Sequence, residues 1–209
     1  MGFGNLNLAT FLFGVPALLL AISVHEFSHG MMAYKLGDPT PKYQGRLTLN
    51  PLVHLDPMGA IMLLLFRFGW AKPVMINPVY FKNRRRGMIY VALAGPVSNV
   101  ILAWVFYNLT SICYLFLTPT AFTLSLVTFL NINIAYNLGL AAFNLIPIPP
   151  LDGSKILGGL LPPKYAFAYA RISEYAPLIL IILLVTGGAQ FVIGPIYRLL
   201  LSLISIISI

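Results

Sequence analysis

The chain has 209 residues, of which 59% are hydrophobic and only 9% are charged. Soluble globular domains have about 25% charged residues, so the composition nearly excludes a water-soluble protein. Thirteen Lys and Arg against five Asp and Glu give a net charge of +8. In so apolar a chain this charge indicates basic cytoplasmic loops rather than a nucleic-acid partner. The single cysteine, Cys113, excludes a disulfide framework and a thiolate zinc cluster, so any metal would need His and carboxylate ligands.

The apolar segments predict an all-α polytopic membrane protein of about four to six spans, folded as one domain over residues 1–209. Residues 8–33 form the first predicted span. No charge occurs in residues 87–151, which contain two long spans, 87–117 and 121–143, joined by a short turn. Two further apolar segments, 175–197 and 199–209, follow near the C-terminus. Residues 58–66 are too short to cross as a straight helix and are predicted to be re-entrant or interfacial.

Residues 35–86 form a basic segment that carries nine of the thirteen Lys and Arg. The positive-inside rule places this segment in the cytoplasm and the N-terminus outside. The first span then runs inward, and residues 144–152 return to the cytoplasmic side of the cell membrane. Residues 70–81 are rich in strand formers and contain two prolines, which suits an interfacial β-like hairpin. We hypothesise that this edge pairs with an extended substrate, although a plain interfacial loop fits the residues equally well.

Two of the five acidic residues adjoin segments that should lie in the bilayer. Asp38 and Asp56 precede prolines in the basic segment, which is typical of turns, and Glu174 lies at the entrance to the last apolar region. Glu26 and Asp152 remain. A carboxylate inside a membrane costs about 2.5–3.5 kcal/mol, so both residues need a compensating interaction.

Glu26 belongs to a His-Glu-x-x-His motif within the first span. The spacing places His25 and His29 on one face of a helix, where both imidazoles can reach one metal ion. Glu26 is rotated by about 100° and can approach a water molecule at that ion. This arrangement indicates a zinc hydrolase. A hydrogen-bonded polar cluster that only packs helices would not need this combination of residues.

A catalytic zinc normally has three protein ligands and an open fourth position, so a third ligand is required. Asp152 follows a segment with three prolines, where irregular backbone can line a cavity at membrane depth. His54, in the basic segment, is the alternative. We favour Asp152, because the turn-forming neighbours of His54 suit a residue that holds its own loop together.

The His-Glu-x-x-His motif in a membrane span and the downstream Asn-x-x-Pro-x-Pro-x-Leu-Asp-Gly, residues 144–153, together resemble the site-2 protease family of intramembrane zinc metalloproteases. Residues 95–99, Gly-Pro-Val-Ser-Asn, and residues 69–74 are similar to the compact bacterial and archaeal members. The resemblance therefore covers residues 20–160. We expect no PDZ-like insertion, as in the larger bacterial members, between these motifs.

The resemblance implies one catalytic Zn²⁺ bound by His25, His29 and Asp152, with Glu26 as the general base. It also implies that Asn144 orients the substrate or stabilises the oxyanion, while a cap or turn residue is the structural alternative. Asn99, in the Gly-Pro-Val-Ser-Asn segment, could line the same cavity or bond to a neighbouring helix.

The expected function is hydrolysis of peptide bonds in a transmembrane protein or peptide, within or near the lipid bilayer. Because a membrane helix hides its peptide bonds in hydrogen bonds, the substrate must unwind locally. One alternative is a transporter in which His and Glu relay protons or bind a transported metal. Another is an inactive chaperone of membrane helices, against which the intact motif argues.

Overall fold

The computed structural model describes residues 8–66 and 71–208, and most of these residues are helical. In chain order the helices and 3-10 turns are α1 (Leu8–Lys35), α2 (Thr40–Tyr43), α3 (Pro51–His54), α4 (Pro57–Phe66), η1 (Pro78–Tyr80), α5 (Arg84–Phe116), α6 (Ala121–Asn144), α7 (Asp152–Leu160), α8 (Pro163–Ala170), η2 (Arg171–Glu174), α9 (Ala176–Val185) and α10 (Ala189–Ile206). The predicted all-α fold is confirmed.

Four helices in the described part of the chain are long and apolar enough to cross a membrane. They are α1 over residues 12–35, α5, α6 and α10. Residues 163–174 and 176–183 form a pair bent by 65°, which adds a fifth span if the pair crosses as one unit. The chain is therefore a multi-pass membrane protein with a number of spans inside the predicted range.

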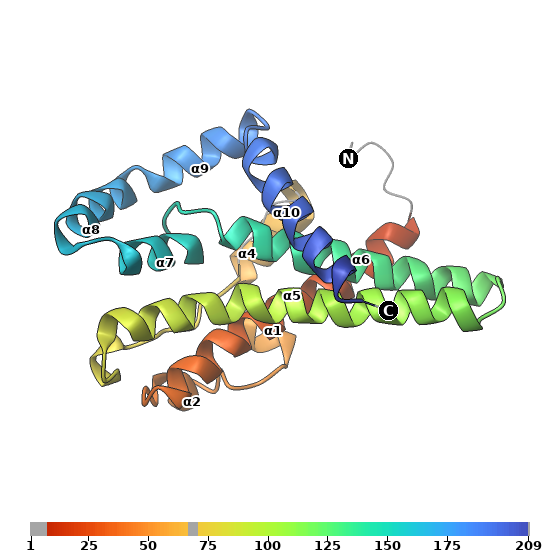
Figure 1. Cartoon of the computed structure of the whole chain (residues 1–209), viewed down its shortest axis with the longest axis horizontal. Coiled ribbons are helices and arrows are strands. Elements are labelled where there is room, and N and C mark those ends of the chain that lie inside the picture. Colours follow the sequence, from red (N-terminus) through yellow and green to blue (C-terminus); the bar gives the residue numbers. More distant parts are fainter. Residues whose placement is uncertain (1–7, 67–70, 209) are drawn as a thin grey trace.

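The three helices α1, α5 and α6 all contact one another and form the centre of the molecule. Figure 1 shows α5 running along α6, with α10 crossing these helices and α7 to α9 gathered at one end. Small side chains on all three helices, such as Ala21, Ala103 and Ala141, are fully buried. Small residues let helix backbones approach closely in a bilayer, where the hydrophobic effect does not drive association.

Helices α5 and α6 each begin directly after a residue whose side chain caps the first turn. The Asn83 side chain accepts a hydrogen bond from the N–H of Arg86, and Thr120 accepts one from Thr123. Such caps satisfy backbone donors that a helix leaves free at its start. Helix α6 thus begins where the sequence predicts its span, while α5 begins at Arg84, inside the predicted basic segment and ahead of the predicted span at residue 87.

Described residues between α1 and α5 contact α1, both through α2 and α3 and through Val74. Helix α4 has ten residues, which agrees with a segment too short to span the bilayer. Residues 71–77 are extended, but their pairing is limited in the described residues to one antiparallel bridge between Leu55 and Ala71. The predicted β-like hairpin is therefore an extended segment with a single bridge. Trp70, the first residue of that predicted hairpin, lies outside the described residues.

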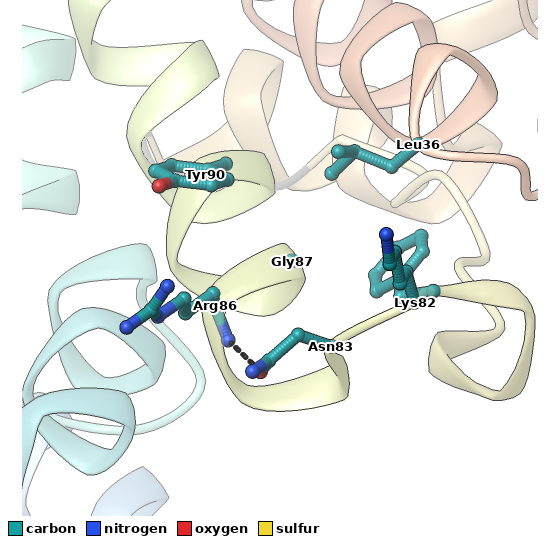
Figure 2. A pocket seen from close by; sticks show the side chains of 7 residues that line it. Leu36, Lys82, Asn83, Arg86, Gly87 and Tyr90 are labelled. Carbon is teal, nitrogen blue, oxygen red and sulfur yellow. Dashed lines mark hydrogen bonds between the residues drawn. The ribbon is translucent and has the colours of Figure 1, made fainter.

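A hollow of about 440 Å³ lies between the end of α1 and the start of α5. Figure 2 shows Leu36 and Lys82 facing Arg86 and Tyr90 across it, with Asn83 capping the first turn of α5. None of the four motif residues 25, 26, 29 and 152 lines this hollow.

Candidate metal centre

The two histidines of the motif lie one helical turn apart on α1, and their rings turn toward each other. The ring centroids are 4.6 Å apart, and the two Nε2 atoms are separated by 3.0 Å. Both side chains are buried between α1 and α5. The i, i+4 spacing therefore brings two imidazole nitrogens to one point, as the sequence predicts.

Asp152 is distant from both histidines in the sequence, but its carboxylate lies beside their Nε2 atoms. Its Oδ2 lies 3.1 Å from Nε2 of His25 and 3.0 Å from Nε2 of His29. Asp152 is the first residue of α7, which follows the proline-rich turn after α6. A Cβ at Gly153 would overlap the carbonyl oxygens of Leu145 and Ile146, so this turn packs too closely for any residue with a side chain.

The outer ring nitrogens of both histidines have partners that fix their protons. Nδ1 of His29 lies 2.7 Å from the carbonyl oxygen of Val91, which can only accept, so Nδ1 carries the hydrogen. Nδ1 of His25 lies 2.6 Å from Oδ1 of Asn99. The amide nitrogen of Asn99 donates to the carbonyl of Ala21, so its oxygen faces His25. In the neutral imidazoles both Nε2 atoms then carry lone pairs that face Asp152.

Three electron-pair donors thus converge without a hydrogen to share, an arrangement that suits a cation. Their separations of 3.0, 3.0 and 3.1 Å form a nearly equilateral triangle. Tetrahedral zinc with N and O ligands at about 2.0–2.1 Å has ligand atoms about 3.3 Å apart. The two imidazoles and the carboxylate match the donor set and approximate spacing of a catalytic zinc site.

The three ligand residues are shielded from solvent, and a lysine pairs with the carboxylate. His25, His29 and Asp152 are 4%, 5% and 3% exposed. The second carboxylate oxygen of Asp152 accepts a hydrogen bond from Lys155 at 3.0 Å. At Gly95 of α5, a Cβ would lie within 2.6 Å of both imidazole rings. The absence of a side chain there lets α5 pack directly against the two histidines.

Glu26 lies next to the histidines on α1, is partly buried, and contacts the extended segment rather than the ligand triangle. Its Oε2 accepts a hydrogen bond from the N–H of Val74 at 3.1 Å. Asn77, three residues further along, donates its N–H to Oδ2 of Asp38 at 2.7 Å. The carboxylates of Glu26, in α1, and Asp38, just after α1, therefore hold residues 71–77 against this part of the molecule.

The remaining predicted residues have other partners. His54 does not belong to the ligand cluster; its Nε2 lies 2.8 Å from the carbonyl of Thr48, and its own carbonyl accepts from Lys72. His54 thus holds its loop together. Asn144 donates to the carbonyl of Leu140 one turn earlier on α6 and is half-buried. Asn99 uses both amide hydrogens and its oxygen within the protein.

Sequence reasoning missed the Val91 carbonyl, Lys155 and Asn137, and it singled out Gly95 only as part of a family motif, without its contact with the two histidines. A backbone carbonyl has no signature in a sequence, so the Val91 contact could not have been found. Lys155, at the third position after Asp152, had a signal in the i, i+3 spacing of opposite charges. Asn137 had one as well, because an amide in an uncharged span requires a buried partner.

Comparison with known proteins gives the family. Residues 109–187 match the model of Peptidase family M50. The chain is 41% identical to "Putative zinc metalloprotease YwhC" of Bacillus subtilis, over 87% of this chain and 84% of that protein. It is 30% identical to "Putative zinc metalloprotease Rip2" of Mycolicibacterium smegmatis, over 84% of this chain and 68% of the relative. For "Putative zinc metalloprotease MJ0611" of Methanocaldococcus jannaschii the identity is 33%, over 73% of each chain. No solved structure matched the chain.

Helices that cross the membrane and a buried His, His, Asp cluster define a membrane-embedded metallohydrolase. The chain belongs to peptidase family M50, the site-2 proteases, and is an intramembrane zinc metalloprotease. The resemblance drawn from the motifs is thereby confirmed, and no comparison favours a transporter.

Proposed function

We propose that His25, His29 and Asp152 bind the catalytic zinc and that Glu26 is the general base. The convergence of three unprotonated ligand atoms within 3.1 Å of one another carries this proposal. A purely structural polar cluster would contain donors as well as acceptors, because buried acceptors without donors are costly. The open fourth position of a three-ligand zinc is where water and substrate would meet.

A zinc ion in this place would polarise the scissile carbonyl and lower the pKa of a water molecule toward about 7. Glu26 then takes the proton of the attacking water and delivers it to the leaving amine. Lys155, whose Nζ donates to Oδ1 of Asp152, favours the carboxylate form of Asp152, which is the form that binds a cation. Asn144 retains Oδ1 and one amide hydrogen without a partner among the described residues, and it is our candidate for binding the substrate carbonyl.

We further propose that the substrate is a transmembrane protein or peptide that binds in extended form beside residues 71–77. This segment is extended, contacts Glu26 through Val74, and has a single β-bridge among the residues that the structure describes. Its remaining backbone groups suit strand addition by an unwound substrate. The ligand residues are almost fully buried, so the extended segment or a neighbouring helix must shift to admit a peptide.

We propose the cell membrane as the location, with the N-terminus outside and the zinc site toward the cytoplasm. Lys82 and Arg84 to Arg86 lie at the start of α5, while the turn at residues 118–120 carries no basic residue. This asymmetry orients α5 with its first turn inside. His25 and His29 lie in the half of α1 that is nearer to the basic segment.

The proposal is tested with detergent-purified wild type and Glu26→Gln. Wild type should contain one zinc per chain and cleave a reconstituted transmembrane peptide. Glu26→Gln should keep that zinc and lose cleavage by about 10²–10⁴-fold, the usual contribution of general acid-base catalysis. If Glu26→Gln lost its zinc as well as its cleavage activity, the result would contradict the role of Glu26 as general base. Movement of zinc across vesicles without any cleavage by wild type would favour a transporter.

A further inference from the structure

Three fully buried asparagines lie on α5 and α6, and the side chains of two of them, Asn99 and Asn137, link α6 to the metal centre. Asn99 of α5 and Asn133 and Asn137 of α6 are all 0% exposed. An amide buried in apolar surroundings is costly unless it is hydrogen-bonded. Three such residues in neighbouring membrane helices therefore require an explanation beyond packing.

The hydrogen bonds between these residues have only one possible direction. Nδ2 of Asn137 lies 2.9 Å from the carbonyl oxygen of Asn133, which can only accept. Oδ1 of Asn137 must therefore face Asn99, and it accepts a hydrogen bond from Nδ2 of Asn99 at 2.8 Å. The direction is thus set by a backbone carbonyl of α6, four residues before Asn137.

The orientation of the Asn99 amide in turn determines which atom faces His25, the proposed metal ligand. The other amide hydrogen of Asn99 goes to the carbonyl of Ala21 at 3.0 Å, so both donors of Asn99 point away from His25. Its Oδ1 is left to face Nδ1 of His25 at 2.6 Å. If the amide of Asn99 flipped, its oxygen would meet two acceptors and its NH₂ group would face His25. That imidazole would then carry its hydrogen on Nε2, where the metal must bind.

We infer that Asn137 is a positioning residue of the zinc site: it holds Asn99 in one amide orientation and thereby keeps Nε2 of His25 free for the metal. The inference rests on the proposed role of His25 as a zinc ligand. The side-chain hydrogen bonds of Asn137 go to Asn133 and Asn99, and none of them reaches the ligand triangle or Glu26. Its effect passes through Asn99 alone, so removing Asn99 should remove the influence of Asn137.

The experiment measures zinc affinity by competition with a chelator in a double-mutant cycle. Asn137→Leu should weaken zinc binding by about 10–100-fold, the usual effect of losing an outer-shell partner. In an Asn99→Ala background, the same change should have almost no further effect. Asn137→Asp, which as a neutral acid keeps one donor and one acceptor, should restore most of the affinity. Asn131→Leu, on the exposed side of α6, is the matched control.

A second measurement does not depend on the metal. In metal-free protein, ¹⁵N NMR of the His25 ring should show the Nδ1–H tautomer in wild type and a mixture in Asn137→Leu. Equal losses of affinity in the wild-type and Asn99→Ala backgrounds would overturn the inference, as would an unchanged tautomer. If Asn137→Leu does not fold, Asn137→Ala replaces it in both measurements. Absence of zinc from the wild type would refute the proposed function instead, while the tautomer measurement would still decide the role of Asn137.

Discussion

The backbone N–H of Val74 donates a hydrogen bond to Oε2 of Glu26 across 3.1 Å, although 48 positions separate the two residues. Val74 is also buried, and its side chain lies 3.5 Å from where a Cβ at Gly30 would be. The contact joins the proposed general base to the segment that we propose binds substrate. A displacement of residues 71–77 would therefore change the position of the Glu26 carboxylate.

Removing this N–H by Val74→Pro should lower peptide cleavage without lowering zinc content. A hydrogen bond to a charged group is worth about 1.5–3 kcal/mol, which corresponds to a loss of about 10–100-fold. Cleavage of a reconstituted transmembrane peptide and metal analysis measure the two effects. Met75→Pro is the matched control, because Met75 is exposed and adjoins Val74 in the same segment. Equal losses in both variants would show that the hydrogen bond has no special role.

The choice between Asp152 and His54 as third ligand has a direct chemical test. Asp152→Ala leaves two imidazoles, so zinc should fall to background after dialysis against a weak chelator. His54→Gln should retain zinc, since Gln can replace the hydrogen bond from Nε2 to the Thr48 carbonyl. Metal analysis of both purified proteins is sufficient. Zinc lost only from His54→Gln would contradict the ligand set proposed above.

Much of this site can be predicted from the sequence, because ionisable residues that are costly to bury are rare in so apolar a chain. The i, i+4 histidines and the acid after the proline-rich turn could be assigned from the cost of burying them, and the structure places their ligand atoms together. The orientation of each imidazole could not be assigned. It depends on the Val91 carbonyl and on the direction of the Asn99 amide, and neither contact leaves a pattern in the residue types.

The extended segment shows a different limit of sequence reasoning. Strand formers and prolines in residues 70–81 indicate extended backbone, and residues 71–77 are extended. The residues do not specify what pairs with that backbone. The described structure provides one bridge at Ala71 and two carboxylates, Glu26 and Asp38, as acceptors for later N–H groups. These acceptors come from distant positions, so local propensity could not predict them.

The proposed orientation predicts which ends of the helices face the cytoplasm. In a Cys113→Ser background, a cysteine placed by Arg84→Cys should resist a membrane-impermeant thiol reagent in intact cells and react after the membrane is opened. A cysteine placed by Thr118→Cys should react in intact cells. The background is suitable because Cys113 is buried and is the only native cysteine. The opposite labelling pattern would invert the topology and place the zinc site outside.

Gly95 gives the sharpest test of the packing that shapes the metal centre. In Gly95→Ala the added Cβ would lie 2.5 Å from Nε2 of His29 and 2.6 Å from Cε1 of His25. Either α5 or the imidazoles must move, and a displacement of about 1 Å at a catalytic site can cost about 100-fold in rate. We expect weaker zinc binding and a comparable loss of cleavage.

Gly139→Ala is the control for this change, because a Cβ at residue 139 of α6 meets nothing within 4 Å. Alanine favours a helix over glycine by about 1 kcal/mol, so this variant should be at least as stable as wild type and fully active. Thermal unfolding, zinc titration and cleavage are measured on both variants. Wild-type zinc affinity in Gly95→Ala would mean that α5 and the two histidines do not pack as closely as the structure places them.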